Sequence, residues 1–153
     1  MFLSRRTASL SILAVVTCLP ARAATISAEG MLTQINTQRK KKNRKPLTLD
    51  PRLTKAAQAH AVELQSRGYG RKDIGGSGHL SKNGATVADR TKAARYRFKK
   101  LAENIAYNTN GQQVVEQWIA SKGHNRNLLD RDVRDCGIGI SGDVYVLKLA
   151  RQL

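Results

Sequence analysis

The stretch CGIGISGDVYVLKL, residues 136–149, decides the fold class of this 153-residue chain. Its apolar halves, 136–140 and 144–149, are typical of buried β-strands, and the Ser-Gly-Asp sequence between them is a hairpin signal. The segments before this stretch have helical spacing instead. Because helices come first and an antiparallel pair closes the chain, the order favours an α+β fold over a doubly wound parallel sheet.

The upstream helical segments have recognisable start and stop signals. Asp50-Pro51 is typical of an N-cap followed by proline in the first turn, and Gly68 is typical of a helix end. Thr86 and Asp89 have the spacing of a capping box. The expected helices are a short one at 31–35 that ends before the basic run at 39–45, then 51–67, 87–94, 114–119 and a short turn at 121–128. The glycine-rich segment 68–84 between them is long enough to be a functional loop.

The N-terminus has the pattern of a secretory signal peptide. Arg5 and Arg6 precede an apolar run at 10–19, and small residues follow at Ala21 and Ala23. The apolar run is shorter than the roughly 20 residues that a membrane-spanning helix needs. We therefore expect a signal peptide at 1–23, no transmembrane segment, and export to the periplasm or the extracellular space as a monomeric single domain, 24–153.

Cysteine content limits how the exported part can be stabilised. Of the two cysteines, Cys136 alone lies outside the expected signal peptide, so the exported part would have no internal disulfide. We interpret Cys136 as a small buried hydrophobe. The alternative is a thiolate nucleophile beside a histidine.

The chain is strongly basic, with 27 lysines and arginines against 11 acids and a formal net charge of +16. The densest basic runs are 39–45 and 90–100. This charge predicts binding to polyanions, and for an exported protein these would be anionic envelope polymers or lipid head groups. Few aromatic residues are interleaved with the basic ones, so nucleic acid would be bound without specificity rather than by base stacking.

Three residues are candidates for a functional site. His79 in the glycine-rich loop and His124 after the fourth helix are not explained by helix packing, whereas His60 lies on an apolar helix face and is interpreted as structural. Glu103 lies in the apolar stretch 101–106, where a carboxylate needs a cation, a metal or hydrogen-bond donors. Two imidazoles and a carboxylate can bind a divalent cation such as zinc or act as general acid and base.

Two common hydrolase motifs are absent from the sequence. There is no H-E-x-x-H spacing of zinc proteases, and no G-x-S-x-G motif of serine hydrolases. Gly76-Ser77-Gly78 has a serine between glycines, but it lacks the strand–turn–helix setting that a nucleophile elbow requires.

Five short motifs follow one another in a family-like order: GH at 78–79, AENIA at 102–106, WIASKGH at 118–124, NLL at 127–129 and GIG at 137–139. In this order and spacing the chain resembles the CAP superfamily of cysteine-rich secretory, antigen 5 and pathogenesis-related proteins, in its bacterial SCP-like form. The resemblance runs from about Met31 to Leu149.

The resemblance implies an α-β-α sandwich with a short antiparallel sheet and a cleft where two histidines and acidic residues meet. Several family members are reported to bind a divalent metal in this cleft. His79 and His124 match the two histidines, which makes them the candidate zinc ligands, and Glu103 matches the first acid. Ser121 stands in place of the second acid, so one anionic ligand is missing, although a serine can still orient a histidine or a water.

The family has no single activity, so the resemblance does not supply the function. We favour an exported binding module of the cell envelope in which His79, Glu103 and His124 line the cleft. One alternative is a hydrolase in which His79 or His124 acts as base and Glu103 orients it or helps to hold zinc. A second is a secreted nuclease, suggested by the charge and by the pairs that His124 makes with Asn125 and Asn127, and this would need a metal.

Overall fold

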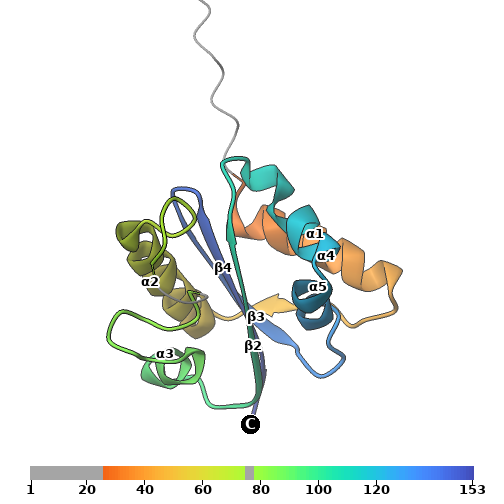
Figure 1. Ribbon diagram of the computed structural model, residues 1–153. Helices are drawn as coiled ribbons and strands as arrows, with labels where there is room; N and C mark the ends of the chain where they lie inside the picture. The colour runs from red at the N-terminus through yellow and green to blue at the C-terminus, as the bar shows by residue number, and fades with distance from the viewer. Residues whose placement is uncertain (1–25, 75–77) are drawn as a thin grey trace, which may run out of the picture.

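The computed structural model describes residues 26–74 and 78–153, and the expected signal peptide and Gly76-Ser77 lie outside these ranges. The described part is an α-β-α sandwich, with helices on both faces of a four-stranded sheet (Figure 1). This confirms the fold class expected from the sequence. The elements are α1 Ala28–Lys41, β1 Thr48–Leu49, α2 Pro51–Arg67, α3 Val87–Ala93, β2 Phe98–Tyr107, the 3-10 turn η1 Gly111–Gln113, α4 Val114–Ala120, α5 Lys122–Leu128, β3 Asp135–Ser141 and β4 Val144–Gln152.

The strand order is β1-β3-β4-β2, so β2 forms one edge of the sheet. The predicted hairpin is present, with β3 antiparallel to β4 and the turn passing through Gly142 at φ 55°. Strand β2 is antiparallel to β4, from Phe98 opposite Gln152 to Tyr107 opposite Val144. The two-residue strand β1 is parallel to β3 at the other edge. Because β1 pairs in parallel, the sheet is mixed rather than wholly antiparallel. The sequence analysis predicted neither β1 nor β2.

Most helix boundaries follow local capping chemistry. The Asp50 carboxylate accepts hydrogen bonds from the Arg52 and Leu53 amides, which begins α2, and Gly68 ends it in the left-handed conformation at φ 80°. The predicted capping box of Thr86 and Asp89 begins α3.

The prediction for the first helix was wrong. Helix α1 begins after the Ser27 N-cap and continues to Lys41, inside the basic run, rather than ending before it. Basic residues in the last turn are favourable there because they face the negative end of the helix dipole.

The two faces of the sheet have separate cores. Helices α1, α4 and α5 cover one face around the wholly buried Trp118, and α2 and α3 cover the other (Figure 1). Gly137 and Gly139 of β3 lie directly beneath α2, and a Cβ at either would collide with the helix backbone at Leu53 or Ala57. Helix α2 therefore packs on β3 with no side chain between the two backbones at these positions.

Candidate functional site

Glu103 is the centre of a buried cluster of charges. The register of β2 on β4 places it opposite Lys148, whose Nζ lies 2.7 Å from Glu103 Oε2. From α3, Nη2 of Arg90 lies 3.0 and 3.1 Å from the two carboxylate oxygens. From the loop after α2, Nδ1 of His79 lies 3.0 Å from Oε1. A carboxylate in this apolar stretch needs cationic or hydrogen-bonding partners, and Lys148, Arg90 and His79 supply them.

The cluster keeps Glu103 ionised. Burial by itself raises the pKa of this carboxyl, but the His79 hydrogen bond and the positive charges of Lys148 and Arg90 outweigh it and lower the pKa to about 2. Burial lowers the pKa of the Lys148 ammonium, against the opposing effect of Glu103. A wholly buried lysine is tolerated here because its charge is paired at hydrogen-bond distance.

His79 is held by the cluster but remains partly open to solvent. Its side chain is 42% exposed, whereas that of Glu103 is 2% exposed. Because Nδ1 faces Glu103, Nε2 on the far side of the ring is the nitrogen left for a ligand. The carboxylate therefore fixes the ring in one orientation, as a hydrogen-bonded carboxylate does for many catalytic or ligating histidines.

The backbone of the loop that carries His79 is anchored from both helices on its face. Arg90 on α3 donates to the carbonyls of His79 and Ala85, at 3.0 and 2.8 Å. On α2, Nε2 of the buried His60 lies 2.8 Å from the Gly78 carbonyl, and Glu63 accepts a hydrogen bond from the Lys82 amide. The interpretation of His60 as a structural residue is confirmed.

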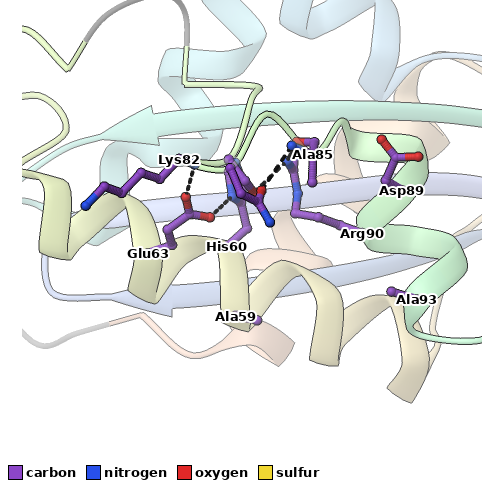
Figure 2. A pocket seen from close by; sticks show the side chains of 10 residues that line it. Ala59, His60, Glu63, Lys82, Ala85, Asp89, Arg90 and Ala93 are labelled. Atoms are coloured by element: carbon purple, nitrogen blue, oxygen red, sulfur yellow. Dashed lines mark hydrogen bonds and ion pairs between the residues drawn. The ribbon is translucent and has the colours of Figure 1, made fainter.

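These anchors border a cavity of about 590 Å³ between α2, α3 and the loop. Figure 2 shows Arg90 extending from α3 toward Ala85, with His60 and Glu63 of α2 beside it. Neither His79 nor His124 is among the lining residues. The cavity therefore lies beside the histidine pair rather than at it.

His124 reaches the same edge of the sheet from the opposite face. Asn104, the wholly buried neighbour of Glu103 on β2, donates to the His124 carbonyl at 3.1 Å and accepts from Asn127 at 2.8 Å. These bonds attach α5 to β2. Burial lowers the pKa of His124, and the electrostatic effect of His79 acts in the same direction.

Ser121 and Cys136 do not complete a catalytic set. Ser121 joins α4 to α5, and its hydroxyl makes no capping hydrogen bond. Cys136 is wholly buried in β3, and burial raises the pKa of its thiol to about 12. The thiol is thus protonated and inaccessible, as expected for a small core residue, which excludes the thiolate alternative.

The described residues do not fit a resident zinc ion. Within 26–74 and 78–153, no three His, Cys, Asp or Glu side chains are arranged to hold a metal. His79 and His124 offer two imidazoles, but both oxygens of Glu103 are already engaged by cations and Ser121 replaces the other acid. Zinc sites in proteins have three or four protein ligands.

Three residues of the site were missed by the sequence reasoning. Lys148 was interpreted as part of an apolar strand, Arg90 as part of a basic run, and Asn104 was given no role. One signal was present: a lysine inside an apolar strand needs a buried acid, and Glu103 in its own apolar stretch needs a cation. Pairing these two needs would have predicted the contact between β2 and β4.

The α-β-α sandwich is the fold that a CAP-type domain would have, and the comparisons agree with this class. The model of the CAP family, the cysteine-rich secretory protein family, matches residues 32–146. This chain belongs to that family.

Individual relatives are similar over most of this chain. The "Uncharacterized membrane protein YlbC" of Bacillus subtilis (strain 168) is 30% identical over 122 residues, 79% of this chain but 33% of that relative, so this chain spans about a third of its length. An extracellular protein containing a SCP domain from Bacillus anthracis str. Ames has a TM-score of 0.71 and 26% identity, covering 81% of this chain and 41% of that one. An outer surface protein from Borrelia burgdorferi shares the fold, with a TM-score of 0.70 and 21% identity over 86% of this chain and 99% of that one.

These neighbours are compatible with export. In the described part of the chain, every helix is too short or too polar to cross a bilayer.

Proposed function

We propose that the chain is an exported CAP-domain binding protein whose ligand site is the β2 edge, where His79 and His124 approach each other. The observation that carries this proposal is the 3.0 Å contact between His79 Nδ1 and the buried Glu103. It orients an imidazole that is 42% exposed and leaves its Nε2 for a ligand. The extracellular description of a structural relative supports the expected location outside the cytoplasm.

The chemistry of the edge favours a polar ligand with hydrogen-bond donors. When His79 donates from Nδ1 to Glu103, its neutral ring presents a lone pair at Nε2, which accepts from a hydroxyl or an N–H group. Burial lowers the pKa of His124, which favours the neutral form of this second imidazole as well. Glycans and peptides of the cell envelope carry such donors.

The test is an NMR titration of residues 24–153 with soluble N-acetylglucosamine oligomers and muramyl peptides. We expect one of these probes to shift the ring signals of both histidines, and the His79→Ala and His124→Ala variants to lose that binding. Glu116→Gln, at an exposed position on α4, is the control and should bind as the parent does. Binding that survives both histidine variants would remove the ligand from this edge.

A second candidate is a hydrolase with His79 as general base. It is favoured by the same contact, because a base oriented by a carboxylate is the arrangement of catalytic dyads and triads. Because Cys136 is buried, the nucleophile in this second candidate is a water molecule activated by His79 rather than a thiolate. Turnover of casein, RNA or DNA by the parent that is lost in both His79→Ala and Glu103→Gln would favour this function; absence of turnover beside measurable binding favours the first.

A further inference from the structure

We propose that a second surface, independent of the histidine pair, binds a linear polymer of phosphate groups. This surface, the basic corner, consists of Lys40, Lys41, Lys42, Arg44 and Lys45, at the end of α1 and in the segment that follows it. In Figure 1 this end of α1 lies on the same side of the sheet as α5.

The basic corner has more positive charge than helix capping requires. Lys40, Lys41, Lys42 and Lys45 are exposed, and Arg44 is half-buried. Basic residues in the last helical turn interact favourably with the helix dipole, which accounts for Lys40 and Lys41. The run continues beyond the turn, so the remaining charge has no such structural role.

A buried arginine adds to the field beneath these lysines. Arg39 is wholly buried, and it donates to the carbonyls of Lys45, Leu128 and Asp130 at 2.8, 2.6 and 3.1 Å. These acceptors are uncharged, and the Asp130 carboxylate is itself paired with Lys100 at 3.0 Å. Burial and then the charge of Arg134 lower the pKa of Arg39, while Asp130 raises it. Positive charges therefore crowd together at this end of the molecule.

A groove beside the lysines offers two cations, Lys40 and Arg44, to a phosphate group. A cavity of about 420 Å³ is lined by Thr33, Asn36, Thr37, Lys40, Arg44 and Pro46. Lys40 and Arg44 can donate to phosphate oxygens, while Nε of Arg44 holds the guanidinium against the Leu129 carbonyl at 2.9 Å. The hydroxyls of Thr33 and Thr37 already donate to backbone carbonyls, so the contacts to phosphate in this groove come from Lys40 and Arg44.

The surroundings favour a polymer over a membrane or a base-stacking nucleic acid. Among the described residues, the exposed large apolar side chains are Val62 on α2, Leu80 in the loop after it and Leu153 at the C-terminus, none of them in the basic corner. A surface that inserts into a bilayer needs apolar side chains beside its basic ones. The run 39–45 contains no aromatic residue on which a base could stack.

The test measures binding of long-chain inorganic polyphosphate by calorimetry at low and moderate salt. We expect tight, salt-sensitive binding by the parent, and a loss of about tenfold or more in the triple variant Lys40→Gln, Lys41→Gln, Lys42→Gln. The matched control changes three other exposed lysines, Lys55→Gln, Lys92→Gln and Lys99→Gln, with the same change in net charge. Its affinity should stay within about twofold of the parent.

Four outcomes would overturn the proposal. Equal losses in the two triple variants would mean that net charge alone drives binding. Tighter binding, per phosphate, to vesicles of phosphatidylglycerol and phosphatidylcholine would make the partner a membrane, and equal affinity for inorganic phosphate would make it a small anion. A loss in His79→Ala as large as in the lysine triple variant would show that the two surfaces are one site. Retained polyphosphate binding in His79→Ala is expected whether or not the histidine site binds a ligand.

Discussion

Replacing Glu103 with glutamine tests the buried charge cluster directly. In the parent, one carboxylate balances a lysine that is 0% exposed and an arginine whose side chain is 10% exposed. The Glu103→Gln variant has nearly the same shape but leaves Lys148 buried without a counter-charge. Removing one partner of a buried ion pair costs about 3–5 kcal/mol.

The pKa of Glu103 gives a second measure of the same effect. It is lowered from 4.5 to about 2 in the folded protein, and each pKa unit corresponds to about 1.4 kcal/mol, which amounts to about 3 kcal/mol. Because the folded pKa lies below the unfolded one, this stabilisation is complete above pH about 5 and is lost as the pH falls toward 2. The cost of Glu103→Gln should therefore be about 3 kcal/mol at pH 6 and nearly vanish near pH 2.

The assay is urea unfolding followed by fluorescence of Trp118, the single and wholly buried tryptophan, at a series of pH values. Glu116→Gln, which changes an exposed glutamate on α4, is the control and should cost less than about 0.5 kcal/mol at every pH. If the two variants cost the same at pH 6, or if the cost of Glu103→Gln does not depend on pH, the paired charges of the cluster do not stabilise the fold.

Three further predictions concern zinc binding, the reactivity of Cys136 and the packing of α2 against Gly137. Zinc titrated calorimetrically into the parent should show no stoichiometric tight binding, because His79 and His124 supply two ligands; tight binding lost in the alanine variants of both would establish a metal site. Cys136 should resist iodoacetamide in the native protein, as followed by mass spectrometry, and react only on unfolding, because burial raises its pKa to about 12. Gly137→Ala should lower the free energy of unfolding by about 3 kcal/mol because the new Cβ meets the α2 backbone, whereas Gly123→Ala, with open space around it, should be neutral or stabilising.

Local chemistry explains which elements were predictable. The Asp50 cap, the Thr86–Asp89 capping box and the helix end at Gly68 depend on residues a few positions apart, and all three are present. The hairpin of β3 and β4 is equally local. The first helix was placed too short because a run of basic residues was taken as its boundary, although Lys40 and Lys41 are good helix formers.

Strand β2 could not be predicted because its stability comes from a distant partner. Its centre carries Glu103 and Asn104, which break the alternation of a half-buried strand. Glu103 is paired with Lys148, which lies opposite it on β4, and Asn104 donates to the His124 carbonyl of α5. The two site histidines were candidates from the sequence itself and then matched the family resemblance. For Lys148 the one signal was a lysine inside an apolar strand, whereas Arg90 is recognisable as a partner of Glu103 only once the fold brings α3 beside β2.

The close approach of α2 to β3 has a consequence for how the protein tolerates change. Since Gly137 and Gly139 leave no room for a Cβ beneath α2, main-chain contacts as well as side-chain packing fix the position of this helix on the sheet. Through their contacts with the loop backbone, His60 and Glu63 of α2 also fix the loop that carries His79. We expect His79 to keep its place through conservative substitutions in the surrounding core, and to lose it on insertion of a single residue within α2.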